Sequence, residues 1–434
     1  MLERKRKLDC ANGREKADLV LKNGNVLNVF TEEVLKADVA ICGDTIVGVG
    51  EYEGKEEIDC TGKYLVPGFI DAHMHIESCM AAPGELAKVL AKAGTTTIIA
   101  DPHEIVNVSG TKGMDYFLKC AAKLLVNVFF MVPSAVPATD VETNGCGEFL
   151  ASDMMKYVDN ARVLGLGETM RFMECCEGEK RMADKLELFA KKHIDGHAPG
   201  IRGKEVQAYR LAGVENDHEC STAEEVLDKL RAGLHIYVRE GSGAKNLETL
   251  IKTMLDAGVC LDRCAFCTDD KHVEEIRKEG HISTCIRKAI ALGVPVAKAY
   301  KMGSYQAAEF YGLKNYGAIG AGYRADIVFL DDLEQVRPLD VMKDGRILTE
   351  EDYAKDYSVP DELLHTVHVG EVTKEKIRLS CDGKTDVIQM NPHQIVTTHL
   401  VEEVPAENGY FKPDGVYNKI CVVERHGKTG EIGV

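Results

Sequence analysis

Two histidines placed two positions apart are the first residues in this sequence whose spacing could do chemistry. His73 and His75 lie in PGFIDAHMHIES, where a Pro-Gly pair begins a short apolar run. On a β-strand, residues i and i+2 face the same side, so the two imidazoles converge, whereas on a helix they would diverge. The pair is weak support for a metal site when taken alone, and its weight depends on what the other strand ends supply.

Four more metal-binding side chains close other short apolar runs. They are Glu168 in ARVLGLGE, His197 in HIDGHAPG, His218 in GVENDHE and Asp269 in RCAFCTDD. Imidazole and carboxylate together suit Zn²⁺, Mn²⁺ or Fe²⁺, and a bridging carboxylate suits a pair of such ions. The six residues therefore predict a site for two divalent metal ions.

The charges of these groups predict how the site would work. We expect Glu168 to bridge two ions, with His73, His75 and Asp269 on one ion. His197 and His218 would hold the other ion. Two cations lower the pKa of a water molecule so that hydroxide exists near neutral pH. Asp269 is then the candidate general base and acid, which makes it and Glu168 the predicted catalytic residues.

Two further motifs offer candidate substrate contacts. Arg239 and Glu240 lie in REGSGAKN, which lacks the Gly-Lys-Ser/Thr ending of a phosphate-binding loop. His103 and Glu104 lie in DPHE, at the end of another apolar run. For this second pair, substrate contact and a hydrogen bond that orients a metal ligand are equally open interpretations.

The arrangement of apolar runs predicts the fold that positions these residues. Eight short runs that end in polar residues alternate with helix-like stretches such as STAEEVLDKLRAG within residues 67–315. Repeated β-then-α units predict a parallel sheet, and eight of them match a closed (β/α)₈ barrel with its active site at the carboxyl ends of the strands. An open doubly wound sheet is the competing α/β topology, but it rarely needs eight units.

The flanks of the barrel read as β structure. Residues 1–66 alternate apolar and polar positions, and Asn23-Gly24 predicts a hairpin turn between two of their strands. Residues 316–350 return to strand character, so both flanks are expected to form one small β domain. Residues 351–434 predict a further β-rich unit that is incomplete.

Composition limits the classes of partner. The net charge of -17 argues against nucleic-acid binding, because an acidic surface repels phosphate backbones. No apolar run approaches the roughly 18 residues that span a bilayer, so no membrane partner is expected. The fifteen cysteines are scattered and odd in number, which is typical of reduced thiols in the cytoplasm.

At the level of motifs, the chain resembles the bacterial and archaeal adenine deaminases from about residue 16 to its end. PGFIDAHMHIES, GTTTIIADPHEIVNVSG, GLGE, DGHAPG, NDHE, VREGS and CTDD follow the order found in that family. The resemblance implies hydrolysis of adenine to hypoxanthine and ammonia at a binuclear site of Mn²⁺ or Fe²⁺, with Zn²⁺ also compatible. It implies the same six metal ligands, and a homo-oligomer is compatible with it.

The sequence departs from the family pattern in three places. Cys79 and Thr169 replace a serine and a valine, which are mild changes. Family members continue into a His-Asp-Ser-His-Asn motif that is absent here. Two alternatives therefore stay open: another cyclic amidine or amide hydrolase of the same superfamily, or a truncated metal-binding pseudoenzyme.

Overall fold

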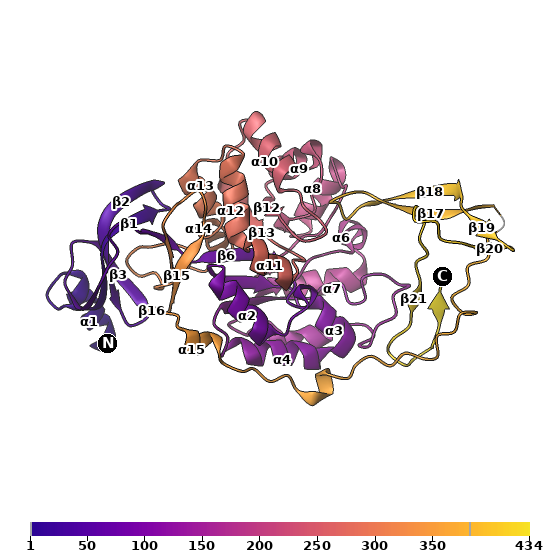
Figure 1. Ribbon diagram of the computed structural model, residues 1–434, viewed down its shortest axis with the longest axis horizontal. Helices are drawn as coiled ribbons and strands as arrows, with labels where there is room; N and C mark the ends of the chain where they lie inside the picture. Colours follow the sequence, from indigo (N-terminus) through magenta and orange to yellow (C-terminus); the bar gives the residue numbers. More distant parts are fainter. Residues whose placement is uncertain (1, 382) are drawn as a thin grey trace.

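The computed structural model describes residues 2–381 and 383–434. The molecule is elongated, with a β sheet at the N-terminal end, a helix-covered barrel in the middle and thin C-terminal strands at the other end (Figure 1). None of the helices among the described residues has the length and apolar character needed to cross a bilayer. The three parts follow one another along the long axis, and the barrel carries the candidate site.

Eight parallel strands form the barrel, as the sequence predicted. They are β6 (Phe69–Met74), β7 (Thr95–Ala100), β8 (Asn127–Val132), β9 (Val163–Leu166), β10 (His193–Ile194), β11 (Asn216–Asp217), β12 (His235–Arg239) and β13 (Cys264–Cys267). Ladders join β6 to β10 and β11 to β13 in chain order. The Asp269 amide donates to the His73 carbonyl at 3.0 Å, and the Glu215 amide donates to the Ile194 carbonyl at 3.0 Å, so the two sheets close into a ring.

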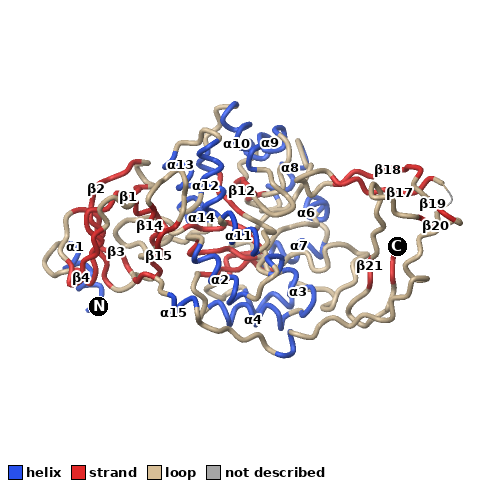
Figure 2. Tube along the Cα trace, in the orientation of Figure 1, coloured by secondary structure: helices blue, strands red, loops and turns tan. Residues whose placement is uncertain are grey.

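Helices follow the strands and cover the outside of the barrel (Figure 2). They are α2 (Pro83–Lys92), α3 (His103–Ser109), α4 (Thr111–Ala121), α5 (Ala151–Met154), α6 (Phe172–Glu177), α7 (Lys180–Leu188), α8 (Lys204–Leu211), α9 (Ala223–Arg231), α10 (Leu247–Asp256), α11 (Val273–Glu279), α12 (Ile282–Ala291), α13 (Val296–Met302) and α14 (Tyr305–Phe310), with short 3₁₀ turns at Glu77–Cys79, Met155–Tyr157 and Leu261–Arg263. Helix α9 begins with a capping box, in which the Thr222 hydroxyl accepts from the Glu225 amide and the Glu225 carboxylate accepts from the Thr222 amide at 3.0 Å.

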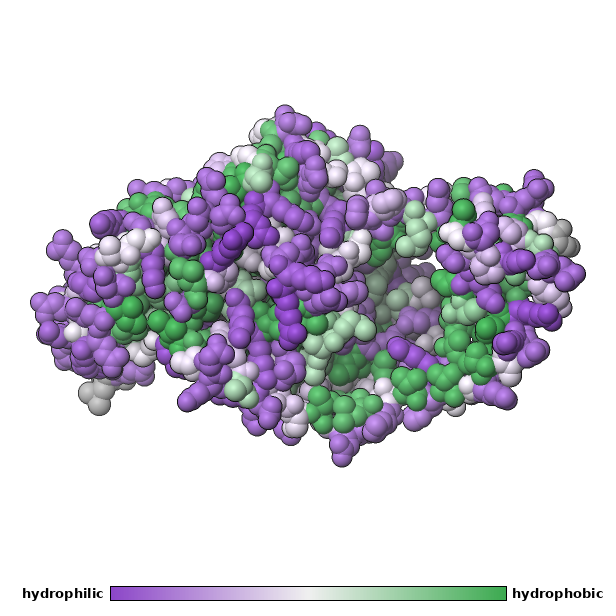
Figure 3. Space-filling view, in the orientation of Figure 1, coloured by the Kyte–Doolittle hydropathy of each residue, from purple (hydrophilic) through white to green (hydrophobic). Residues whose placement is uncertain are grey.

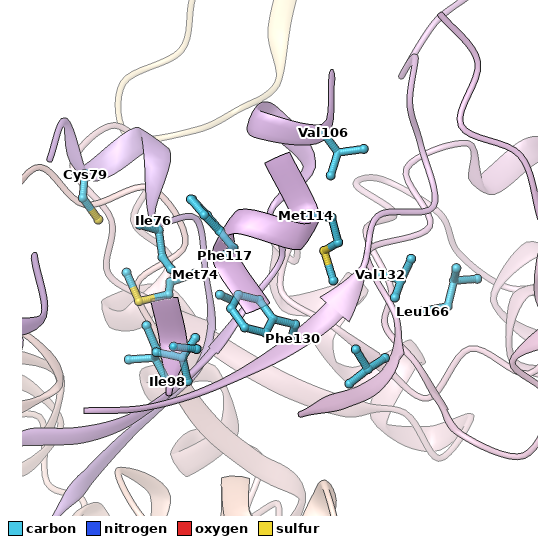
Figure 4. Close-up of a cluster of buried hydrophobic side chains, with 14 of the residues drawn as sticks. Met74, Ile76, Cys79, Ile98, Val106, Met114, Phe117, Phe130, Val132 and Leu166 are labelled. Atoms are coloured by element: carbon cyan, nitrogen blue, oxygen red, sulfur yellow. The ribbon is translucent and has the colours of Figure 1, made fainter. Parts of the chain in front are cut away.

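Apolar side chains fill the space between the strands and their helices. Figure 4 shows Met74, Ile98 and Phe130 from the strands facing Met114 and Phe117 of α4. All five are buried to 2% exposure or less, so this layer is a packed core in which each lost methylene group is felt. The core fixes the strands whose ends bear the candidate site.

The N-terminal sheet joins both flanks of the barrel, in agreement with the predicted fold. Its strands are β1 (Ala17–Asn28), β2 (Glu33–Cys42), β3 (Thr45–Gly50), β4 (Gly54–Asp59), β5 (Tyr64–Pro67), β14 (Ile327–Leu330), β15 (Pro338–Lys343) and β16 (Arg346–Ile347), and α1 (Leu2–Ala11) packs beside them. The antiparallel pairing of β5 with β14 is the seam between the flanks. The exact domain limits at residues 66, 315 and 350 stay a prediction.

The hairpin turn predicted at Asn23-Gly24 is wrong. Strand β1 runs through this dipeptide, and its pairing with β2 shifts register there, which is a β-bulge. Asn23 adopts a left-handed φ of 60°, and its amide donates to the Asp38 carboxylate at 2.9 Å. Asparagine and glycine supply the same backbone freedom to a bulge as to a turn, so the dipeptide alone cannot separate the two.

The C-terminal segment is built from small pieces. After α15 (Glu350–Tyr353) and a 3₁₀ turn at Asp361–Leu363 come β17 (Lys384–Met390), β18 (Thr397–Glu403), β19 (Ala406–Glu407), β20 (Tyr410–Phe411), β21 (Val422–Val423) and β22 (Ile432–Gly433). They pair as three separate two-stranded sheets. The expected β-rich character is confirmed, but these strands share no larger sheet.

Candidate active site

The six predicted metal-binding residues meet at the carboxyl-terminal rim of the barrel. His73 is on β6 and His75 follows it, while Glu168, His197, His218 and Asp269 lie just beyond β9, β10, β11 and β13. Five of the six are at most 6% exposed, and the side chain of His197 is 15% exposed. The parallel strands bring all six to one end of the molecule, as the sequence pattern requires.

Glu168 stands in the middle of this cluster with one oxygen toward each half. Its Oε1 lies 3.0 Å from His75 Nε2, and its Oε2 lies 2.5 Å from His197 Nδ1 and 3.4 Å from His218 Nε2. The Glu168 amide donates to the Asp101 carboxylate at 2.8 Å, which fixes the backbone behind it. A carboxylate divided in this way has the geometry of a bridge between two cations.

Asp269 faces the first half of the cluster. Its Oδ1 lies 3.0 Å from His75 Nε2 and 3.6 Å from His73 Nε2. Its Oδ2 accepts a 2.5 Å hydrogen bond from Arg239. The residue has a left-handed φ of 56°, uncommon for a non-glycine residue. Its amide donates to the His73 carbonyl at 3.0 Å, and its carbonyl accepts from the His75 amide at 3.2 Å. One carboxylate oxygen is thus anchored, and the other is presented to the histidines.

The unsatisfied atoms of the cluster show that it fits metal ions. Both ring nitrogens of His73 and Nε2 of His218 are buried without a hydrogen-bond partner among the described residues. Buried polar atoms in this condition are costly unless something binds them. Two groups of ligand atoms each lie within 4.8 Å of one another: His73, His75 and Asp269, and His73, Glu168 and His218. Histidine and carboxylate donors in such groups match divalent transition metals.

Burial and neighbouring charges act strongly on the ionisation of these groups. Burial, together with the charge of His218, lowers the pKa of His73 to about 4. Burial acts on His75 in the same direction, but the carboxylates of Glu104 and Glu168 overcome it and raise the pKa of His75 well above its usual range. Burial alone would raise the pKa of Glu168, yet His197 and His75 hold it well below its usual range. Without metal ions, protons on the imidazoles balance the negative charge of the carboxylates. Bound cations would take over that role and displace the protons.

The four candidate substrate contacts are placed differently. His103 joins the cluster, with Nδ1 3.1 Å from Glu168 Oε1, and Glu104 Oε2 lies 3.5 Å from His75 Nδ1. Arg239 is 3% exposed and is held between the carboxylates of Glu219 and Asp269. Glu240 forms a 2.5 Å ion pair with Lys288 of α12 and does not enter the cluster.

Two site residues were missed in the sequence. Asp101 directly follows β7, and Glu219 directly follows His218. Burial raises the pKa of Asp101 to about 7, whereas His197 and His218 overcome burial and lower the pKa of Glu219 to about 2. The signal is present in the sequence, because both are carboxylates at strand ends, in DPHE and NDHE, beside the predicted site residues His103 and His218.

Comparison with known proteins agrees with the geometry. The Amidohydrolase family model matches residues 64–348. An adenine deaminase of Desulfitobacterium hafniense is 46% identical over 423 residues, which cover 97% of this chain and 74% of that protein. An adenine deaminase of Clostridium acetobutylicum is 43% identical, with 99% of this chain and 76% of that protein covered.

Solved structures share the fold at low identity. Atrazine chlorohydrolase from Arthrobacter aurescens, complexed with zinc, superimposes with a TM-score of 0.57 at 15% identity, covering 77% of this chain and 96% of that one. A β-aspartyl dipeptidase from Fervidobacterium islandicum gives a TM-score of 0.56 at 19% identity, covering 79% of this chain and 99% of that one. Since relatives above 40% identity span nearly the whole chain, it belongs to the adenine deaminase family of the amidohydrolases.

Proposed function

We propose that this protein is a metal-dependent adenine deaminase that hydrolyses adenine to hypoxanthine and ammonia. The observation that carries the proposal is the buried cluster of four histidines and two carboxylates at the mouth of the barrel, in a chain of this family. The substrate is a small neutral purine, in keeping with the acidic surface of the chain.

In this proposal, His73, His75 and Asp269 hold one divalent cation, His197 and His218 hold the other, and Glu168 bridges them. The orphaned nitrogens of His73 and His218 and the two-sided position of Glu168 support this division. Imidazole and carboxylate donors favour Mn²⁺ or Fe²⁺, and Zn²⁺ is compatible with the same donors. When bound, the ions supply Lewis acidity and make a water molecule nucleophilic near neutral pH.

The chain's own groups move the proton. Asp269 Oδ1 accepts a proton from the attacking water and delivers it to the departing amino group, so that water and adenine become hypoxanthine and ammonia. Arg239 keeps Asp269 Oδ2 occupied, so only Oδ1 is free for the transfer. His103 and Glu104 stand beside Glu168 and His75, where they either contact the purine or orient those ligands.

We further propose that the enzyme works in the cytoplasm on a small-molecule substrate, without nucleic-acid or membrane partners, and that it is compatible with a homo-oligomer. All fifteen cysteines are free thiols, which suits a reducing compartment.

The test is adenine turnover by this chain after reconstitution with Mn²⁺ or Fe²⁺, followed by ammonia release and hypoxanthine formation. A rate that a chelator abolishes and added metal restores would support the proposal. Two bound metal ions without adenine turnover would contradict it and direct attention to other cyclic amidines or to an inactive metal-binding protein.

The bridging role has its own test. Glu168→Gln removes the negative charge of the proposed bridge between the two cations, so metal content measured by elemental analysis should fall from two equivalents toward one. Glu215→Gln is the matched control, because Glu215 also pairs with a histidine, His193 at 2.7 Å, on the same barrel but outside the cluster. Unchanged occupancy in Glu168→Gln would refute the bridge.

A further inference from the structure

A basic groove lies on the outside of the barrel, away from the metal-binding cluster. It runs between α2, α11 and α12 and the loop that leads into β15, and its volume is about 850 Å³. Figure 1 shows α2 and α11 next to each other on the face toward the viewer. Six cationic side chains line it, and they are Lys88, Lys92, Arg277, Lys278, Arg287 and Arg337.

The charge of this groove is opposite to that of the chain as a whole. Only two carboxylates, Glu85 and Glu279, line it, whereas the whole chain has a net charge of -17. Glu279 is engaged with Lys271 at 2.5 Å, and the three lysines of the groove are paired, Lys88 with Glu85 at 2.7 Å, Lys92 with Glu350 at 3.9 Å and Lys278 with Glu274 at 2.8 Å. The excess positive charge therefore comes from the three arginines. A concave surface with a net positive charge focuses the field and attracts anions.

The three arginines keep their charge available. Among the residues that the structure describes, Arg277 and Arg337 form no ion pair with a carboxylate, and both are exposed. Arg287 donates to neutral oxygens, the Glu279 carbonyl at 2.9 Å and the Thr284 hydroxyl at 3.2 Å. A guanidinium group presents a planar fork of donors that matches phosphate oxygens, and it remains charged at every relevant pH.

The wall of the groove also holds a strained residue. Val336, between Gln335 and Arg337, has a left-handed φ of 51° and is 1% exposed. This conformation is energetically unfavourable for a β-branched residue. Residues with strained backbones are found often at ligand sites, where the surrounding structure holds them in place. The strained backbone shapes the part of the loop that brings Arg337 to the groove.

We propose that this groove binds an oligophosphate, meaning a small molecule with two or more linked phosphate groups such as a nucleoside triphosphate. Its volume is in the range of small-molecule sites, and unpaired arginines are the residues best suited to phosphate. The ligand would join α2, which follows β6, to α11, which follows the Asp269 segment after β13. It would therefore tie together the first and last strands of the barrel. The proposal does not depend on which substrate the metal cluster acts on.

The experiment is calorimetric titration of the metal-loaded full chain with ATP and, separately, with tripolyphosphate at low salt. We expect saturable binding of one equivalent that weakens as sodium chloride rises, because the contacts are ionic. In the double variant Arg277→Gln/Arg337→Gln the dissociation constant should rise at least tenfold, as estimated from the loss of two charge-assisted contacts. Arg231→Gln, with a side chain that is 72% exposed elsewhere on the barrel, is the matched control and should bind as the parent does.

If tripolyphosphate binds as tightly as ATP, the phosphate groups account for the affinity. If ATP binds more tightly, the nucleoside also contacts the groove. Both results support an oligophosphate site in the groove. No saturable binding of either probe would overturn the proposal. So would equal affinity in the parent and the double variant, because the probe would then be bound elsewhere, as at the metal cluster. If the double variant loses metal or melts early, Arg277→Lys/Arg337→Lys keeps the charge, and its affinity should fall between the two.

Discussion

At the rim of the barrel, side chains from several strands hold each candidate residue, whereas the C-terminal strands β17 to β22 pair only two by two. Asp71 of β6 illustrates the rim: its carboxylate accepts from the His73 amide at 3.1 Å and from the Thr268 amide at 3.2 Å. It thereby sets the backbone at His73 and at Thr268, which directly precedes Asp269. In the C-terminal hairpin, Ile388 and Met390 are 59% and 78% exposed.

The two regions differ in what they contribute: the rim holds the candidate catalytic residues, and the C-terminal strands border the opening above them. A two-stranded hairpin is marginal without a packed face, so the C-terminal strands depend on their anchors to the barrel. One anchor is the Lys245 amide, which donates to the His393 carbonyl at 3.0 Å, and another is Lys428, whose Nζ donates to the Asn144 carbonyl at 2.7 Å. Figure 3 shows a hollow between the barrel and these strands. The strands thus border the mouth of the barrel while the rim supplies all six cluster residues.

The largest expected effect is at the rim. Asp269→Asn removes the proton acceptor that faces the cluster but keeps the shape of the side chain, so adenine turnover should fall by about a thousandfold or more. Steady-state ammonia release measures the rate, and circular dichroism checks that the fold is retained. Asp256→Asn at the end of α10 is the matched control, since this exposed carboxylate is not part of the cluster. Turnover of Asp269→Asn within tenfold of the parent would remove the assigned role.

The rim was predictable from sequence because the fold does the positioning. Once eight β-then-α units were recognised, any polar residue at a strand end was bound to reach the same rim, which placed His197, His218 and Asp269 together. The pairing of Arg239 with both Glu219 and Asp269 was not predictable, because it depends on how strands stagger around the closed barrel.

The flanks were less predictable for a different reason. The β-bulge at Asn23 and the predicted hairpin turn use the same residues. Only the observed pairing of β1 with β2 distinguishes the bulge from a turn. In the C-terminal segment, alternating apolar residues predicted strands but not their partners. Val387 lies opposite Leu400 and Ile388 opposite His399, yet in the described part of the chain no further strand joins this pair.

A matched pair of core and surface substitutions tests the contrast in packing. Ile98→Ala removes a side chain that is 1% exposed within the barrel core (Figure 4) and should lower the free energy of unfolding by about 3 kcal/mol. Ile388→Ala removes the same atoms from β17, where the residue is 59% exposed, and should change it by less than about 0.5 kcal/mol. Denaturant unfolding of both variants measures the difference. Equal losses would show that the C-terminal hairpin packs as a core element.

The smallest effect concerns a buried charge that the barrel tolerates. Lys185 of α7 is 4% exposed and donates to the Ser134 carbonyl at 2.6 Å, and burial lowers its pKa to about 8. Below pH 8 the amine is charged in both the folded and unfolded states, and the folded state bears the cost of burying it. Between pH 8 and about 10.5 the unfolded chain binds more protons, so stability rises with pH through this window.

Lys185→Met has no such titration. The free energy of unfolding of the parent minus that of the variant should therefore rise by somewhat less than about 3 kcal/mol from pH 7.5 to pH 10.5, measured by denaturant unfolding at each pH. Lys384→Met on exposed β17 is the control, and it should change stability by less than about 0.5 kcal/mol at both ends of the range. A parent-minus-variant difference for Lys185→Met that stays flat would mean that the buried amine keeps its proton through its bond to Ser134. The cost of burying charge in the barrel would then be smaller than its depth suggests, and the difference between barrel and C-terminal strands would rest on apolar packing alone.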